Sequence, residues 1–383
     1  MKIAYIITRG DAVGGATIHV RDMASAMRDL GHEPLILAGG SGPAIDQFKA
    51  AGVPVRSLRY LCRQVHPVLD LMAVAELREA LHDFAPNLVS AHTAKAGWIG
   101  RAAARLLGIP AIYTPHGLPV AGRFSRSSGR FFTFVERAAA SWCSAIICVS
   151  ESERRLALAG RIAPPQRLFV VHNGVRDVPP ELRACPEREP VRICSVARLD
   201  HPKDFATLLT ALSFLKDQPW TLDLVGEGPL RDAVRRLSAR LGIAERLCFL
   251  GYQPDPAPVL ARCQMLVLSS LSEAFPRSIL EAMRTGLPVI ATDVGGIREA
   301  VRHRETGLLV PSRDPASLAR AIAQLTAAPK LRHELGVRAR CEFEQRFRLE
   351  YTMKKTLAVY ARAIAESSPQ LDRVQREHPA TGC

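Results

Sequence analysis

The feature that most constrains the fold of this chain is a strand–helix–strand pattern between residues 265 and 296. Its first part, Met265–Leu268, is an apolar run typical of a buried parallel strand. Pro276 suits the first turn of a helix, because the N–H that proline lacks has no partner there. A second predicted strand, Pro288–Thr292, runs into Gly295-Gly296. Such units predict a parallel sheet, in which ligands bind beyond the carboxyl ends of the strands.

Two carboxylates follow the first of these strands. Glu273 ends the polar turn and Glu281 lies in the second turn of the predicted helix. Carboxylates accept hydrogen bonds from sugar hydroxyls, and the helix N-terminus between them offers N–H groups to a phosphate. The combination favours a nucleotide-sugar. Taken alone, two glutamates at this spacing more often cap a loop and face solvent.

The same alternation extends to the N-terminus and predicts a doubly wound parallel sheet in each half of the chain. The 383 residues suffice for two domains, and the 48% apolar content supports a core in each. Further strands are predicted at Lys2–Ile7, Pro34–Leu37, Val53–Leu58, Asn87–Ala91, Ala111–Tyr113, Ala145–Val149, Phe169–Val171, Val191–Val196, Leu222–Val225 and Leu247–Leu250.

Glycines and basic residues follow several of these strands. Gly14 and Gly15 precede a helix, so their backbone can approach an anion closely, although a tight turn without a ligand fits equally. Arg198 and Lys203 can neutralise a diphosphate, whereas most such residues are surface charges. His116 ends a strand, where a lone histidine is more often structural than functional.

The net charge of +14 fits nucleic acid, an anionic membrane surface or an anionic substrate. No nucleic-acid motif accompanies it, so we expect no nucleic-acid partner. Residues 123–142 carry basic side chains, and the predicted helix Ser127–Trp142 has an apolar stripe that includes Ala138. This helix fits an anionic membrane surface, or equally an ordinary helix covering a sheet.

The nine cysteines form no Cys-x-x-Cys pair, which indicates buried thiols in a reducing compartment. No run of eighteen apolar residues occurs, so no membrane-spanning helix is expected. We therefore predict a cytoplasmic protein, with a peripheral position on the inner face of the cytoplasmic membrane as a further expectation.

The stretch SEAFPRSILEAMRTGLPVIATDVGG, residues 272–296, resembles the donor-site signature of the retaining glycosyltransferases of family 4, group 1. The resemblance covers nearly the whole chain and is of the bacterial surface-polysaccharide type. It implies the GT-B fold, with two Rossmann-like domains facing each other across a cleft. The expected boundaries are 1–176 for the acceptor-side domain, 177–190 for a linker and 191–349 for the donor-binding domain. A helix at 350–366 would pack back on the first domain, and 367–383 would be a disordered tail.

The resemblance also assigns roles to individual residues. It implies catalytic roles for Glu273, His116, Arg198 and Lys203. It implies donor contacts from Gly14, Gly15, Arg198, Lys203, Gly226, Gly228, Tyr252, Glu273, Ala274, Phe275, Pro276, Arg277, Ser278 and Glu281. Two positions depart from the family pattern: Arg176 stands where an acid is usual, and Ala197 stands where glycine is common.

The expected activity is transfer of a hexose from a nucleotide-sugar to a lipid-linked or growing glycan acceptor, with retained configuration. A UDP-sugar is favoured over a GDP-sugar as the donor. No Asp-x-Asp occurs, so no metal and no obligatory cofactor are expected. Two alternatives stay open: a catalytically silent partner of another transferase, and a nucleotide-sugar epimerase on the same fold.

Overall fold

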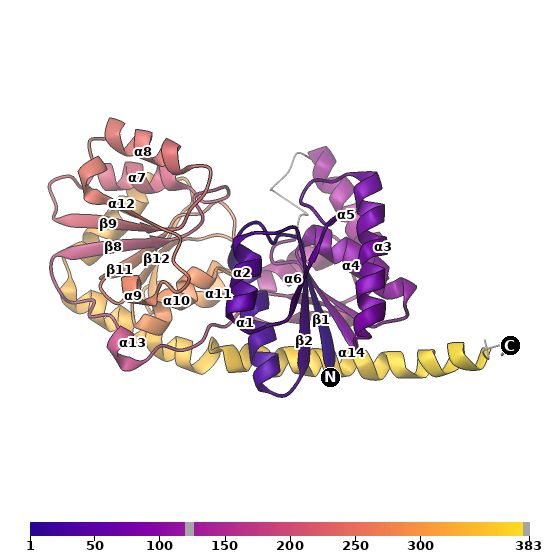
Figure 1. Ribbon diagram of the computed structural model, residues 1–383. Helices are drawn as coiled ribbons and strands as arrows, with labels where there is room; N and C mark the ends of the chain where they lie inside the picture. The colour runs from indigo at the N-terminus through magenta and orange to yellow at the C-terminus, as the bar shows by residue number, and fades with distance from the viewer. Residues whose placement is uncertain (119–125, 378–383) are drawn as a thin grey trace. The chain divides into compact units, whose positions relative to one another are not determined.

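A computed structural model describes residues 1–118 and 126–377, apart from the side chains of 126–128, 131 and 368–377. The chain divides into two compact units (Figure 1). Unit 1 comprises Met1–His172 together with the chain from Thr352, and unit 2 comprises Asn173–Tyr351. Among the described residues, no helix is long and apolar enough to cross a membrane.

Unit 1 contains a seven-stranded parallel sheet in the order β3-β2-β1-β4-β5-β6-β7. Its central strands are buried, as expected of parallel strands covered on both faces. The strands are β1 (Lys2–Ile7), β2 (Glu33–Gly39), β3 (Val55–Leu58), β4 (Leu88–His92), β5 (Ala111–Thr114), β6 (Ala145–Cys148) and β7 (Leu168–Val170).

The helices of unit 1 place their apolar residues against this sheet. In the first of them, Val20, Met23 and Met27 recur at helical spacing and are buried. The helices are α1 (Gly15–Asp29), α2 (Pro43–Ala50), α3 (Pro67–Phe84), α4 (Ala94–Leu106), α5 (Arg126–Ala140), α6 (Glu151–Ala159) and the 3₁₀ turn η1 (Pro165–Arg167).

Unit 2 contains a six-stranded parallel sheet in the order β10-β9-β8-β11-β12-β13. Its strands are β8 (Val191–Val196), β9 (Trp220–Val225), β10 (Leu247–Gly251), β11 (Met265–Leu268), β12 (Val289–Thr292) and β13 (Gly307–Val310). The strand order reverses beside β1 in one sheet and beside β8 in the other, so each unit has a topological switch point where ligands commonly bind. The expectation of two doubly wound parallel-sheet domains is confirmed.

The helices of unit 2 are η2 (Pro180–Leu182), α7 (Phe205–Ser213), α8 (Arg231–Arg240), η3 (Ala244–Arg246), α9 (Ala257–Leu260), α10 (Arg277–Thr285), α11 (Ile297–Ala300), α12 (Pro315–Thr326) and α13 (Pro329–Arg346). Pro276 is the N-cap of α10 and not a residue of its first turn, because its backbone is still extended. The sequence analysis did not predict β13, which is short and follows a turn.

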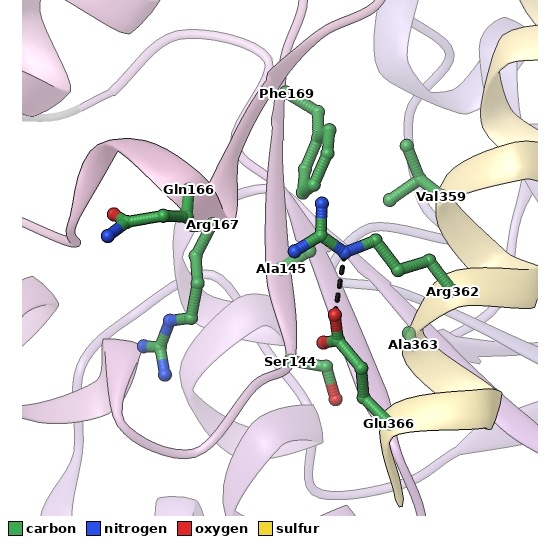
Figure 2. A pocket seen from close by; sticks show the side chains of 9 residues that line it. All are labelled: Ser144, Ala145, Gln166, Arg167, Phe169, Val359, Arg362, Ala363 and Glu366. Atoms are coloured by element: carbon green, nitrogen blue, oxygen red, sulfur yellow. Dashed lines mark hydrogen bonds and ion pairs between the residues drawn. The ribbon is translucent and has the colours of Figure 1, made fainter.

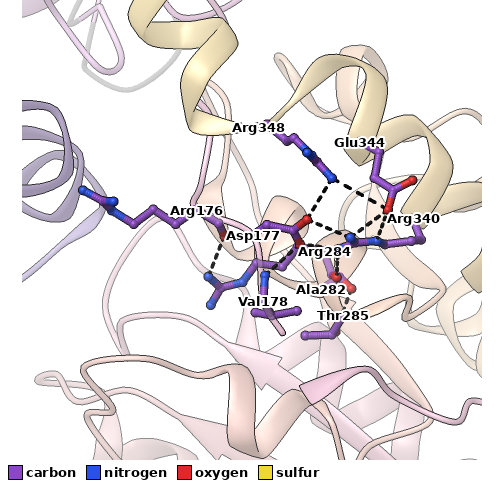
Figure 3. A network of polar contacts seen from close by, with 9 residues as sticks. All are labelled: Arg176, Asp177, Val178, Ala282, Arg284, Thr285, Arg340, Glu344 and Arg348. Atoms are coloured by element: carbon purple, nitrogen blue, oxygen red, sulfur yellow. Dashed lines mark hydrogen bonds and ion pairs between the residues drawn. The ribbon is translucent and has the colours of Figure 1, made fainter. Parts of the chain in front are cut away.

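The segment 177–190, expected to be a linker, belongs to unit 2. Asp177 pairs with Arg340 and Arg348, as Figure 3 shows. Partial burial raises the pKa of Asp177, but the hydrogen bonds from Arg340 outweigh this and lower it below its usual value. Further along, the buried Arg332 donates to the carbonyl of Pro186 at 2.6 Å. Buried guanidinium groups need such acceptors, so this segment is held against unit 2.

The last helix, α14 (Leu349–Glu377), continues past residue 366, where a disordered tail was expected. Within unit 1, the Arg362 guanidinium lies over the Phe169 ring and pairs with Glu366 (Figure 2). The cavity beside them is about 10 Å³, room for about one water molecule, so it is a packing gap and not a ligand site.

Helix α5 differs from the amphipathic helix that was expected. Its buried face includes Glu136, which accepts hydrogen bonds from Trp98 at 2.8 Å, Arg101 at 2.9 Å and Tyr113 at 3.0 Å. Ala138, predicted to belong to the apolar stripe, is exposed. The stripe was misplaced because a buried carboxylate with three donors cannot be recognised from periodicity. Residues 123–125 of the expected basic segment lie outside the described residues.

Candidate active site

The switch point of unit 2 lies where the loops after β8 and β11 run side by side. The N–H of Leu271 donates to the carbonyl of Pro202 at 2.9 Å, and the N–H of Asp204 donates to that of Ser269 at 3.0 Å. Because β8 and β11 are neighbours in the sheet, both loops leave it at the same edge. Arg198 and Lys203 come from the first loop and Glu273 from the second, so the sheet brings together residues predicted from separate motifs.

We call Arg198, Asp200, Lys203, Ser270 and Glu273 the charged cluster. Lys203 Nζ forms an ion pair with Glu273 Oε1, and Ser270 Oγ donates to the same oxygen at 2.7 Å. Arg198 pairs with Asp200. The side chains of Lys203 and Glu273 are only 16% and 12% exposed, so water screens their charges less than it screens those of surface pairs. The cluster therefore holds two cations, each paired with a carboxylate: Arg198 with Asp200 and Lys203 with Glu273.

Gly295, which the sequence analysis did not place in the site, holds the backbone of Glu273. Its φ is +56°, and an added Cβ would lie 1.8 Å from the carbonyl oxygen of Glu273. The N–H of the next residue, Gly296, donates to that same oxygen at 3.2 Å. Only glycine allows this approach. The Gly295-Gly296 pair, which begins three residues after the end of β12, was the sequence signal for a tight turn here.

The glycines after β9 also permit close backbone packing. A Cβ at Gly226 would lie 2.0 Å from the carbonyl oxygen of Ala197, and one at Gly228 would lie 2.3 Å from that of Leu199. The turn is thus fitted against the loop that carries Arg198. The N–H of Gly226 also donates to the carbonyl of Gly251 at 2.8 Å, which brings the residue before Tyr252 to the same edge of the sheet.

The N-terminus of α10 follows Glu273 and Ala274 directly. The amide of Asn173 donates to the carbonyl of Phe275 at 2.9 Å, and Arg277 donates to that of Gly174 at 3.0 Å. The turn is therefore fastened by the segment that opens unit 2, while no described side chain caps the helix. The first-turn N–H groups, including that of Ser278, give this end a partial positive charge. Glu281 is buried one turn further on.

The switch point of unit 1 lies at the ends of β1 and β4. Thr8 and Thr93 share a hydrogen bond of 2.8 Å between their hydroxyls, which ties the two loops together. Helix α1 begins here with Gly14 as its N-cap and with no side-chain cap in the described structure. A Cβ at Gly15 would meet no heavy atom within 4 Å outside its chain neighbours. Within the described part of the chain, Gly15 therefore borders open space, unlike Gly295.

Three histidines gather at this edge of unit 1: His19 from α1, His92 at the end of β4 and His116 after β5. The ring centroids of His19 and His116 are 4.8 Å apart, and those of His92 and His116 are 5.2 Å apart. We call these residues, with Ser90 and Tyr360, the histidine cluster. The sequence analysis singled out His116 from its position at the end of a strand. It missed His19, which carries no local signal within α1.

His116 has a left-handed backbone, with φ at +55°, which is rare for a residue with a side chain. The buried Glu153 holds the turn by accepting from the N–H of Gly117 at 2.7 Å and of Leu118 at 3.0 Å. Its second oxygen accepts from the N–H of Val149 at 2.8 Å. The sequence analysis missed Glu153, although Ser150-x-x-Glu153 is a capping-box pattern.

Comparisons with known proteins identify the class to which this fold and site belong. The family model described as "Glycosyl transferases group 1" matches residues 184–341, and that described as "Glycosyl transferase 4-like domain" matches residues 14–174. A D-inositol 3-phosphate glycosyltransferase of Acidothermus cellulolyticus is 30% identical over 93% of this chain and 87% of its own length. The chain belongs to the group 1 glycosyltransferases, as its signature motif indicated. It is therefore an enzyme that uses a nucleotide-sugar.

A further relative and a solved structure define the likeness more closely. An Escherichia coli UDP-Gal:alpha-D-GlcNAc-diphosphoundecaprenol alpha-1,3-galactosyltransferase is 26% identical over 75% of this chain and 78% of its own length. The structure of Anabaena HepE in complex with UDP-glucose superposes with a TM-score of 0.81 at 23% identity, covering 96% of this chain and all of the other. The likeness to HepE bears on the fold alone, and it confirms the GT-B fold.

Proposed function

We propose that this enzyme transfers a hexose from a UDP-sugar, with retained configuration, to a lipid-linked or growing glycan acceptor in surface-polysaccharide biosynthesis. The observation that carries the proposal is the charged cluster at the switch point of unit 2, next to the uncapped N-terminus of α10. The names of two relatives support a UDP-sugar and a lipid diphosphate as donor and acceptor.

In the proposed donor complex, the diphosphate contacts Arg198, Lys203 and the first-turn N–H groups of α10. These groups provide positive charge without a metal, which matches the preference of phosphate for arginine and for helix N-termini. Glu281 accepts hydrogen bonds from the ribose hydroxyls. Gly226, Gly228 and Tyr252 border the nucleotide, and Gly14 and Gly15 of unit 1 approach the diphosphate.

Catalysis follows from the same groups. As the bond between the anomeric carbon and the diphosphate oxygen breaks, that oxygen gains negative charge, and Arg198 and Lys203 stabilise it. The departing phosphate accepts the proton of the acceptor hydroxyl, whose oxygen then bonds to the anomeric carbon on the same face. His116 and Glu273 orient the hexose. The configuration is thereby retained, and NMR of the product formed from an α-linked donor should show an α-linkage.

Two fixed cations beside the diphosphate site lead us to propose that no divalent metal is required. Activity should survive dialysis against a strong chelator, measured with the same enzyme before and after treatment. Complete loss that is restored by magnesium or manganese would refute this part of the proposal.

We propose that α5 brings the enzyme to an anionic membrane surface on the cytoplasmic side. Arg130 and Arg137 are exposed on this helix, and Phe134 is 69% exposed between them. An exposed aromatic ring flanked by cations suits a lipid interface. In a flotation assay, vesicles with anionic lipid should carry the enzyme, and Phe134→Ser should weaken this. Equal flotation with neutral vesicles would count against it.

The donor site can be tested by thermal denaturation with UDP, GDP, ADP and their hexose conjugates. A ligand of the native state raises the melting temperature, so UDP and its conjugates should do so and the others should not. Glu281→Ala should lose the effect, whereas Glu334→Ala, which removes an exposed glutamate of the same unit, should keep it. No shift with any nucleotide would favour a silent partner. Conversion of the donor without an acceptor would favour an epimerase.

A further inference from the structure

A continuous line of hydrogen bonds connects α14 to His116 inside unit 1. The Tyr360 hydroxyl donates to Ser90 Oγ at 2.7 Å, and Ser90 Oγ lies 3.0 Å from His92 Nε2. His92 Nδ1 in turn lies 3.0 Å from His116 Nε2. Tyr360, Ser90 and His92 are all buried, so water does not compete for these bonds. The sequence analysis did not find this line because Tyr360 and Ser90 are 270 residues apart.

The direction of donation along this line follows from the protonation of Tyr360 and His92. Burial raises the pKa of Tyr360 to about 12, so its hydroxyl keeps its proton and donates it to Ser90. Burial, with a smaller effect of the neighbouring His116, lowers the pKa of His92 well below its usual value, so His92 is neutral and has one N–H. Among the described residues Ser90 Oγ makes only these two hydrogen bonds, so its own proton points to His92 Nε2. The single N–H of His92 is at Nδ1 and donates to His116 Nε2.

We propose that Tyr360, Ser90 and His92 are positioning residues that hold neutral His116 as its Nδ1–H tautomer. In this form Nε2 of His116 is occupied by His92, and Nδ1–H is a donor for an oxygen of the transferred sugar. This inference rests on the proposed contact between His116 and the sugar. It adds that His116 acts there only as a donor, which suits a hydroxyl or ether oxygen of an uncharged sugar.

Packing also fixes the plane of the two rings. Tyr5 stacks on His92 with centroids 5.9 Å apart, and His19 meets the His116 ring edge to face. Glu153 holds the backbone on the other side of His116, whose left-handed conformation persists through these surroundings. A strained residue held from several sides is a common feature of functional sites. The line of hydrogen bonds sets the tautomer of His116, and the packing sets the direction in which its imidazole ring points.

The three histidines have ring nitrogens within 4.8 Å of one another, so a metal ion is the competing interpretation. The contact between His92 and His116 argues against it. Their nitrogens are 3.0 Å apart, their centroids 5.2 Å apart and their planes within 22°, so the rings point at each other head to tail. That is the arrangement of an N–H···N bond. Two ligands of a tetrahedral ion would instead point their lone pairs at a third position.

The test combines ¹⁵N NMR of imidazole-labelled enzyme with steady-state transfer kinetics. The His116 resonances, identified by their loss in His116→Gln, should show a protonated Nδ1 and an unprotonated Nε2. Ser90→Ala should produce a mixture of tautomers and lower kcat about tenfold, the usual scale for a group that orients another, while KM for the donor changes less than twofold. Tyr360→Phe should likewise produce a mixture of His116 tautomers and lower kcat.

The double variant Ser90→Ala/Tyr360→Phe should be no slower than Ser90→Ala alone, because both changes interrupt one line. The control is Tyr351→Phe, the same substitution on α14 at a side chain that is 43% exposed. It should change neither the His116 tautomer nor kcat. A unique Nε2–H tautomer of His116, or tautomers unaltered by Ser90→Ala, would overturn the proposal. So would stoichiometric binding of Zn²⁺ that His19→Ala abolishes. The tautomer is read without substrate, so a failure of the proposed transfer reaction would be recognised separately.

Discussion

The two switch points of this enzyme are built from different chemistry on similar sheets. In unit 2, the charged cluster joins Lys203 to Glu273 and Arg198 to Asp200. In unit 1, the line from Tyr360 to His116 consists of hydroxyl and imidazole groups, without an ion pair. Fixed charges stabilise an anion whose charge grows during reaction, whereas neutral donors and acceptors orient hydroxyl groups. From this difference we propose that Arg198 and Lys203 of unit 2 stabilise the diphosphate, whereas His116 of unit 1 helps to orient the sugar.

The largest expected effect comes from removing a cation of unit 2. Lys203→Ala should lower kcat/KM for transfer by about 10²–10³-fold, the scale seen when a group that stabilises developing negative charge is lost. It also leaves Glu273 without its ion-pair partner. The measurement is initial-rate kinetics with the donor identified by thermal denaturation. Lys216→Ala, an exposed lysine of the same unit, is the control and should be unchanged. A loss below tenfold would contradict the role of Lys203.

His116→Gln should lower kcat by about 10²-fold, because orientation of the reacting sugar is lost. The affinity for UDP, which lacks the sugar, should not change. Steady-state kinetics and equilibrium binding of UDP together separate the two effects. If His116→Gln weakened the binding of UDP as much as it slowed transfer, the proposal that His116 orients the sugar and does not bind the nucleotide would be wrong.

The sequence predicted the fold class, which is confirmed, and proposed candidate site residues, because both rest on local patterns. Apolar runs of strand length gave the sheets, and one contiguous motif contained Glu273, Glu281 and the turn into α10. The ends of strands then pointed to His116, Arg198 and Lys203. Which catalytic and donor-binding roles these residues have stays a prediction.

What the sequence did not predict depends on pairs of residues that are distant along the chain. Glu136 is buried because Trp98, Arg101 and Tyr113 meet it, and periodicity cannot show three such donors. Likewise, the Gly295-Gly296 pair indicates a tight turn, but it does not show that Gly295 packs against the carbonyl of Glu273. These interactions arise from tertiary packing, so local patterns carry almost no trace of them.

A comparison of two glycines tests whether the backbone at Glu273 matters. Both Gly295 and Gly286 have positive φ, but a Cβ at Gly286 would meet nothing within 4 Å. Gly286→Ala should therefore cost only about 1 kcal/mol of unfolding free energy, from backbone strain. Gly295→Ala adds a clash with the Glu273 carbonyl and should cost roughly 2–3 kcal/mol more. Urea denaturation measures both, and equal losses would contradict the account.

The smallest effect is expected at Asp177, outside both clusters. Its folded-state pKa is lowered, so the pairing with Arg340 stabilises the fold above the unfolded pKa of about 4 and is lost as the pH falls through the lowered value. Because the carboxylate is largely exposed to solvent, Asp177→Asn should cost about 1 kcal/mol or less at pH 7. Urea denaturation from pH 7 to pH 2 should show the variant approaching the wild type in acid. Asp217→Asn, an exposed control, should match the wild type throughout.

The central claim is that unit 2 binds the nucleotide through the charges of Arg198 and Lys203, and that His116 of unit 1 does not contribute to this binding. Calorimetric titration of UDP into wild type, Lys203→Ala and His116→Gln tests it directly. The account predicts at least about tenfold weaker binding for Lys203→Ala, or about 1.4 kcal/mol, and a change below twofold for His116→Gln. Full affinity in Lys203→Ala together with weakened binding in His116→Gln would contradict it.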